Sequence, residues 1–309
     1  MRCRIVNFIL RLSPNLLLYS FILCCLFLPI FAQNDDEVIN IESSIVILNA
    51  TISDSRGKTV AGLKQPQFKI FEDRKEQKIE FFEAAETPFA AVILLDTSGS
   101  MEKHISMARS AAINFLDGLR PNDGAAIYNF DSKISLVQDF SNSRDISERI
   151  FDLKADGYTA LNDAIYKATQ ELAKRPEKRK AIIVLSDGAD NKSGRSADNA
   201  LKTALGSGVT IYTVDMSSVT ANATERMQSL GALKNFAEKS GGIFVAASGG
   251  VAMREAFKDI VEELRVQYTL GYQPSNTKKD GRWRSIELRV ARPDLNIRTR
   301  EGYNAPKEK

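Results

Sequence analysis

Three short segments of small polar residues have the composition of a site for a hard metal ion. Residues 96–100 read DTSGS, residues 157–161 read GYTAL and residues 186–188 read SDG. Divalent cations such as Mg²⁺ take carboxylate, hydroxyl and water oxygens, about six at roughly 2.1 Å. Ser98 and Ser100 follow Asp96 by two and four residues, so an exposed, tight loop could turn both hydroxyls toward one point.

The candidate ligands are Asp96, Ser98, Ser100, Thr159 and Asp187. Only two of these side chains are carboxylates, and Asp187 could act directly or through bound water. A divalent cation among them would keep residual positive charge and an open coordination position. Such an ion favours an anionic ligand from another molecule.

Each segment taken alone also has a structural interpretation. The segment 96–100 could be a turn that caps the next helix, Thr159 could be a helix cap, and Asp187 could be a turn residue. The combination of all three favours the metal site. Asp190 and Asn191 could add a ligand at its rim, but a solvated loop is the simpler interpretation.

A doubly wound α/β fold would bring the three segments together. Apolar runs at 89–95 and 181–186 are typical of strands buried on both faces. Strands and helices alternate from 88 to 265, which predicts a mostly parallel sheet covered by helices on both faces. Ligands bind at the carboxyl ends of such strands, where all three segments fall. The expected helices are 103–119, 143–152, 161–174, 196–206, 226–239 and 250–265; the other expected strands are 125–130, 133–140 (an antiparallel edge strand), 209–214 and 242–247.

The flanking residues 33–84 and 266–309 have the alternation and β-branched content of strands. We expect them to form one small all-β sandwich from both ends of the chain, with the α/β domain at 88–265 inserted in it. A separate amino-terminal sandwich with a carboxy-terminal tail is the alternative. The expected strands are 38–52, 68–71, 79–82, 266–274, 283–292 and 296–303, with a hairpin connection at 72–77.

Residues 1–32 have the pattern of a secretory signal peptide. Arg2, Arg4 and Arg11 precede an almost wholly apolar stretch at 16–31. Cleavage near Ala32 would give a secreted or periplasmic protein; an uncleaved anchor at residues 12–31 is the alternative. The three cysteines, at positions 3, 24 and 25, all lie in this leader. We therefore expect no disulfide, thiolate zinc site or cysteine nucleophile in the mature protein.

Charge and histidine content exclude other classes of function. The chain of 309 residues has 42 basic and 39 acidic side chains, and three of the basic ones lie in the leader. The remaining 39 basic residues are balanced by 39 acidic ones, so bulk charge gives no support for nucleic-acid binding. The single histidine, His104, excludes schemes that need two. Neither a G-x-x-x-x-G-K-[ST] nor a G-x-G-x-x-G motif is present.

The set D-x-S-x-S at 96–100 with Thr159 and Asp187 resembles the metal-ion-dependent adhesion site of von Willebrand factor type A domains. The resemblance covers about 88–265, and the flanks resemble bacterial secreted proteins related to that family. It implies bound Mg²⁺, or Mn²⁺ or Ca²⁺, with Asp187 acting mostly through water and the other four residues as direct ligands. It also implies a protein partner whose Glu or Asp completes the coordination. Some family members shift their last helix, here 250–265, when ligand binds.

These observations favour a non-catalytic, metal-dependent binding or adhesion module. One alternative is a structural or assembly protein with a vestigial metal site, in which the sandwich makes the contacts. A metal-dependent hydrolase is the weaker alternative, because no histidine, lysine or second carboxylate cluster falls at the predicted site. Membrane association is expected only through an uncleaved leader.

Overall fold

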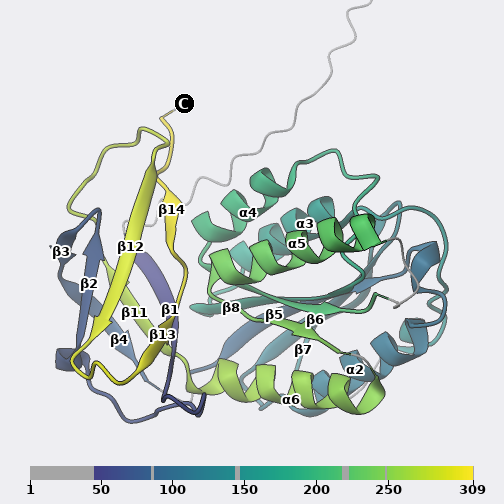
Figure 1. The fold of residues 1–309 in the computed structure, drawn as a ribbon, viewed down its shortest axis with the longest axis horizontal. Coiled ribbons are helices and arrows are strands. Elements are labelled where there is room, and N and C mark those ends of the chain that lie inside the picture. Colours follow the sequence, from purple (N-terminus) through teal and green to yellow (C-terminus); the bar gives the residue numbers. More distant parts are fainter. Residues whose placement is uncertain (1–44, 85–86, 143–146, 218–222, 248, 309) are drawn as a thin grey trace, which may run out of the picture. The chain divides into compact units, whose positions relative to one another are not determined.

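The computed structural model of the protein describes residues 45–308, except 85–86, 143–146, 218–222 and 248 (Figure 1). The signal peptide predicted at 1–32 and the start of the strand predicted at 38–52 lie outside this part of the chain. Within it, no helix combines the length and the apolar character that a membrane crossing requires.

A six-stranded sheet with the order β10-β9-β8-β5-β6-β7 occupies the middle of the chain. Its neighbours pair in parallel except β6 and β7, which are antiparallel at one edge. Every residue of the central strand β5 is buried, which explains its unbroken apolar sequence. The predicted mostly parallel sheet with an antiparallel edge strand is confirmed. The strands are β5 (Phe89–Asp96), β6 (Gly124–Phe130), β7 (Ile134–Ser141), β8 (Arg179–Ser186), β9 (Val209–Asp215) and β10 (Phe244–Ala246).

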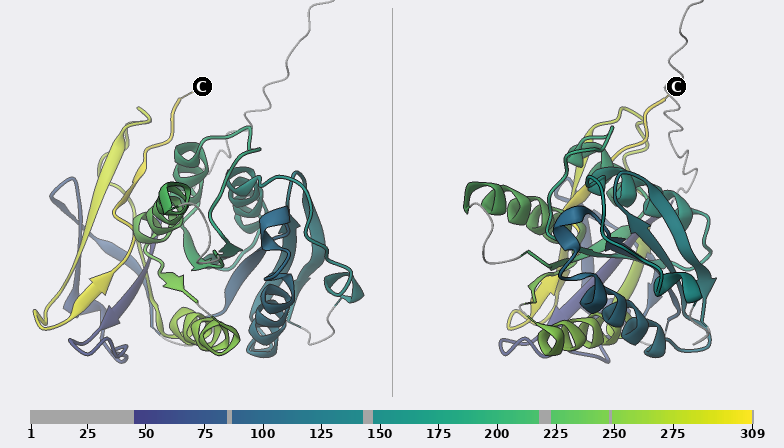
Figure 2. Two further views of the ribbon diagram at one scale, coloured as in Figure 1. Left: turned by 45° about the vertical axis from the view of Figure 1, so that its right-hand side comes forward. Right: turned by 90° about the vertical axis from the view of Figure 1, so that its right-hand side faces the viewer.

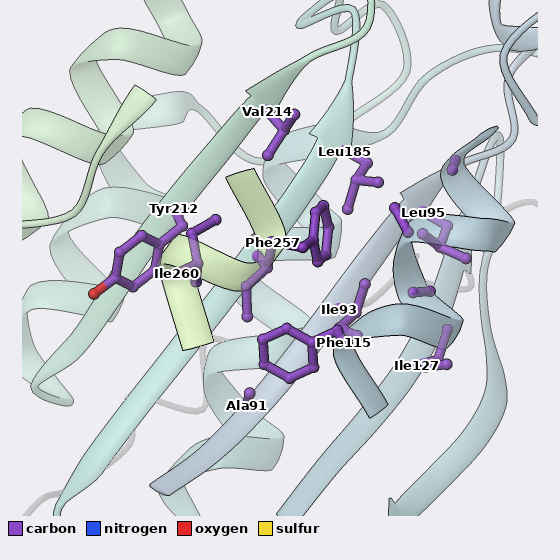
Figure 3. Close-up of a cluster of buried hydrophobic side chains, with 14 of the residues drawn as sticks. Ala91, Ile93, Leu95, Phe115, Ile127, Leu185, Tyr212, Val214, Phe257 and Ile260 are labelled. Carbon is purple, nitrogen blue, oxygen red and sulfur yellow. The ribbon is translucent and has the colours of Figure 1, made fainter. Parts of the chain in front are cut away.

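Helices cover both faces of this sheet (Figure 2). Alternate residues of β5 point to opposite faces, so Ile93 belongs to one buried core and Val92 to the other. In the first core, Phe115 of α2 meets Phe257 of α6 edge to face, with ring centroids 6.1 Å apart (Figure 3). Helices α3, α4 and α5 pack over the second core. The helices are α2 (Ile105–Asp117), α3 (Leu161–Ala173), α4 (Ala197–Gly206), α5 (Ala223–Ser240) and α6 (Gly250–Val266).

The helix predicted at 143–152 is wrong for the described part of that segment. Only a single 3-10 turn, Glu148–Ile150, forms there. The backbone carbonyl of Leu153 accepts a hydrogen bond from Arg109 of α2 (3.2 Å), whose guanidinium lies over the Phe151 ring. The N–H groups of Ile150, Phe151 and Asp152 donate to carbonyls three residues before them, so the helical bonding is limited to one tight turn.

Two further four-stranded sheets have the orders β13-β1-β11-β4 and β14-β12-β2-β3. All their strand pairs are antiparallel, and they join segments from either side of the α/β part, since β1 pairs with β11 and β2 with β12. Leu48 and Tyr268 from one sheet share a buried core with Ile70 and Leu288 from the other. The strands are β1 (Val46–Ser53), β2 (Phe68–Glu72), β3 (Lys75–Gln77), β4 (Ile79–Glu83), β11 (Tyr268–Tyr272), β12 (Trp283–Val290), β13 (Asn296–Arg298) and β14 (Gly302–Asn304).

Two details of these sheets differ from the sequence prediction. The segment 72–77, expected to be a plain connection, contains β3 after a tight turn at Asp73 and Arg74, whose φ angles are 48° and 67°. The segment expected to be one strand at 296–303 is divided between the two sheets. Arg300, between β13 and β14, is buried and donates hydrogen bonds to the backbone carbonyls of Ile47 (2.7 Å) and Leu205.

Candidate metal centre

The parallel pairing of β5 and β8 brings two polar side chains to the carboxyl edge of the sheet. Asp96 is the last residue of β5 and Ser186 the last of β8, and both are fully buried. The Ser186 hydroxyl donates a hydrogen bond to Asp96 Oδ2 (2.5 Å), and the backbone N–H of Ser98 donates to Asp96 Oδ1 (2.9 Å). The carboxylate is therefore held in one orientation by the strand beside it and by its own loop.

The loop after Asp96 brings its two serine hydroxyls together. A 3-10 turn at Gly99–Met101 follows Ser98, and the Oγ atoms of Ser98 and Ser100 lie 3.1 Å apart. Ser100 is exposed, but Ser98 is only 2% exposed, so the expectation of an exposed loop is wrong at this position. The first hydroxyl lies beneath the surface and the second at its edge.

The segment that carries Thr159 lies directly against this loop. The Gly99 N–H donates to the Gly157 carbonyl (3.2 Å), and the Asp156 N–H donates to the Thr97 carbonyl (2.8 Å). Gly157 has a φ of 77°, which favours glycine, and a Cβ atom there would lie 2.8 Å from the Ser132 hydroxyl of the turn between β6 and β7. Thr159 itself is 2% exposed.

The backbone of Thr159 is held on both sides by the loop that follows β8. Its N–H donates to Asn191 Oδ1 (2.8 Å), while its carbonyl accepts from the N–H groups of Asn191 (3.1 Å) and Lys192 (3.0 Å). Asp190 Oδ2 likewise accepts from the N–H of Asn162 (2.8 Å). Asp190 and Asn191 are both exposed, as expected of a solvated loop, and in addition both accept hydrogen bonds from the backbone at 159–162.

Asp187 is the first residue of the same loop, and the next residue, Gly188, packs closely against α5. Asp187 Oδ1 accepts a hydrogen bond from the Ala189 N–H (3.1 Å). Gly188 has a φ of 82°, and a Cβ atom there would lie 2.5 Å from the Ser229 carbonyl oxygen of α5. The position of the Asp187 backbone is thus fixed against α5.

The electrostatics of this edge suit a cation. Burial raises the pKa of Asp96 to about 6, against the lowering effect of the hydrogen bonds from Ser186 and Ser98; the negative charge of Asp187 raises it further. A nearby cation would favour the ionised form of the Asp96 carboxylate. Together with the adjacent hydroxyls, the carboxylates form a set of oxygen donors, which is the kind of ligand that a hard divalent cation prefers.

Hydroxyl groups would have to supply much of the coordination. In the described part of the chain, no three His, Cys, Asp or Glu side chains form a group suited to a metal ion. Only Asp96 and Asp187 among the five candidate ligands are carboxylates, and the other three would be neutral hydroxyls.

Sequence reasoning missed the residues that hold the candidate ligands in place. Ser186 lies within the SDG segment, and its position at the end of the strand next to β5 could have indicated its bond to Asp96. Asn191 was considered only as a rim ligand, since its bond to Thr159, 32 residues away in sequence, has no local signal. Thr97 similarly accepts a hydrogen bond from the Asn129 amide at the end of β6 (3.1 Å).

Residues 91–189 match the family model of the von Willebrand factor type A domain. This segment includes all five candidate ligands. The uncharacterized protein sll0103 of Synechocystis sp. is 33% identical over 119 residues, which cover 37% of this chain and 28% of that protein. The match therefore spans less than a third of the length of this relative.

Solved structures are similar to this chain at low sequence identity. The von Willebrand factor type A structure from Catenulispora acidiphila aligns with a TM-score of 0.50 and 14% identity over 87% of this chain and 76% of that chain. The PilB minor pilin from Streptococcus sanguinis aligns with a TM-score of 0.46 and 17% identity over 58% of this chain and 62% of that chain. The α/β part of the molecule thus has the von Willebrand factor type A fold, with additional all-β sheets.

Proposed function

We propose that the protein is a binding module that captures an acidic residue of a protein partner through a divalent cation at the carboxyl edge of the central sheet. The observation that carries this proposal is the buried Asp96 carboxylate, followed by two serine hydroxyls 3.1 Å apart. The family match over 91–189 supports the same function.

In this proposal Asp96, Ser98, Ser100 and Thr159 hold Mg²⁺, or Mn²⁺ or Ca²⁺, directly, and Asp187 holds it through water. The cation supplies positive charge at an open position, where a partner's Glu or Asp binds. The chain's own contribution is orientation, because Ser186 fixes the Asp96 carboxylate.

We propose that the protein is non-catalytic and acts outside the cytoplasm. The signal peptide predicted at 1–32 would direct the chain to the periplasm or the exterior. The sandwich strands would then support or extend the binding domain.

Calorimetric titration of the mature chain with Mn²⁺ tests the metal site. We expect saturable binding to the wild type and none to Asp96→Ala, because this change removes a buried carboxylate from the centre of the donor set. Asp117→Ala is the matched control, since Asp117 is exposed at the end of α2. Equal heats from wild type and Asp96→Ala would refute metal binding at this site.

Affinity capture of partners with and without EDTA tests whether partner binding requires the metal. We expect the partner to be lost when the cation is removed and restored by added Mn²⁺. A partner that stays bound in EDTA would favour the structural role instead. Turnover of phosphoesters or peptides that Asp96→Ala abolishes would favour the hydrolase.

A further inference from the structure

Helix α3 begins without a cap of its own. Its N-cap residue is Ala160, which offers no side-chain acceptor for the first N–H groups of the helix. The loop after β8 supplies these acceptors, because Asp190 accepts from the Asn162 N–H (2.8 Å) and Ser193 Oγ from the Asp163 N–H (3.1 Å). The start of α3 is thus built from two segments that are distant in sequence.

The loop is fixed in return by α3. The Asp163 carboxylate accepts hydrogen bonds from the backbone N–H groups of Gly194 (2.8 Å) and Arg195 (3.1 Å). The Arg195 guanidinium also lies 3.9 Å from the centre of the Tyr166 ring. A loop held at several points can act as a rigid support for its neighbours.

Thr159 is the candidate metal ligand whose backbone is bonded to this supporting loop. The neighbouring N–H groups of Tyr158 and Ala160 donate to Ser132 Oγ (3.0 Å) and to the Asp131 carbonyl (2.9 Å), both in the β6–β7 turn. Only the Thr159 N–H among these three donates to the loop that carries Asp187, through Asn191 Oδ1.

We propose that Asn191 is a positioning residue that fixes the backbone of Thr159 so that its hydroxyl is presented to the cation. This inference rests on the proposed function, since it gives Asn191 a role at the same site. Asn191 does not touch the cation; it ties the segments of two candidate ligands, Thr159 and Asp187, into one unit. Without its side chain the Thr159 hydroxyl would sample more positions, and part of the binding energy would be spent on ordering it.

Titration with Mn²⁺ of wild type, Asn191→Ala and Asn191→Asp tests the role. One hydrogen bond contributes about 1 kcal/mol, so we expect Asn191→Ala to bind Mn²⁺ about fivefold more weakly. Asn191→Asp keeps an acceptor for the Thr159 N–H and should bind at least as tightly as the wild type. Asn162→Ala is the matched control, because the Asn162 amide joins the same two segments through the Arg195 carbonyl (3.3 Å) without touching Thr159.

A double-mutant cycle separates positioning from general stability. If Asn191 acts through Thr159, Asn191→Ala should have no further effect on Mn²⁺ affinity in a Thr159→Ala background. Equal affinity of Asn191→Ala and wild type, or full additivity of the two changes, would overturn the inference.

Amide hydrogen exchange in EDTA provides a readout that needs no metal. We expect the Thr159 N–H to exchange at least about fivefold faster in Asn191→Ala, since its acceptor is gone, and the Tyr158 and Ala160 N–H groups to be unchanged. Unchanged protection of Thr159 would overturn the positioning role. Failure of the wild type to bind Mn²⁺ would refute the proposed function and the metal role of Asn191, while the exchange result would still show whether Asn191 orders Thr159.

Discussion

Asp96 carries the main electrostatic cost of the candidate site. Its carboxylate is buried at the end of β5, and burial raises its pKa to about 6. The Ser186 hydroxyl offsets part of this cost by donating to Oδ2, while its own oxygen accepts from the Gly188 N–H (2.9 Å). One hydroxyl therefore links the carboxylate to the loop that carries Asp187.

Ser186→Ala should destabilise the metal-free protein. The change leaves a buried carboxylate oxygen and the Gly188 N–H without this partner, and we expect the free energy of unfolding to fall by about 1–3 kcal/mol. Urea unfolding in EDTA measures the loss. Ser207→Ala is the control, because the buried Ser207 hydroxyl has no hydrogen-bond partner among the described residues. Equal stability of the two variants would contradict the role given to Ser186.

At the scale of elements, Arg179, the first residue of β8, ties the carboxyl end of α6 to strand β11. Its fully buried guanidinium donates to the carbonyls of Leu264 (3.2 Å) and Arg265 (3.1 Å) in the last turn of α6 and to Thr269 Oγ1 of β11 (2.8 Å). Burial lowers the pKa of Arg179 to about 10, so the side chain remains charged at neutral pH. A shift of α6 along its axis would have to break this set of bonds.

Arg179→Met should be among the more destabilising single changes in the chain. It removes a buried donor group and leaves several carbonyl oxygens without this partner, each at a cost of about 1–3 kcal/mol. Chemical unfolding followed by circular dichroism would show the loss, with Arg289→Met as control. Arg289 is exposed on β12, where it pairs with Glu287 (2.6 Å) and lies over the Phe71 ring, so its removal should cost about 1 kcal/mol or less. A similar midpoint for both variants would mean that Arg179 does not hold α6.

For the whole molecule, the sequence predicted the strands and helices whose positions depend on hydrophobic periodicity and burial. Strands buried on both faces, such as 89–95 and 181–186, stood out as apolar runs, and the helices on either side had apolar residues at helical spacing. The two-part strand at 296–303 was not predictable, because its halves pair with β1 and β12, strands of two different sheets.

The candidate ligands were predictable because each lies in a short polar string after a recognisable element. Their supports were not: Asn191 meets Thr159 only because β8 and the start of α3 lie side by side in the folded chain. Local patterns indicate which side chains could bind, whereas their positioning depends on contacts made by the tertiary fold.

Diffraction from crystals of the mature chain grown with Mn²⁺, recorded at a wavelength where manganese scatters anomalously, tests the central claim most directly. We predict one anomalous peak within about 2.0–2.4 Å of oxygens from Asp96, Ser98, Ser100 and Thr159, with water between the ion and Asp187. A remaining position should hold water or a carboxylate from a neighbouring molecule. Saturating Mn²⁺ with no peak at this edge, or a peak bound by other residues, would contradict the account.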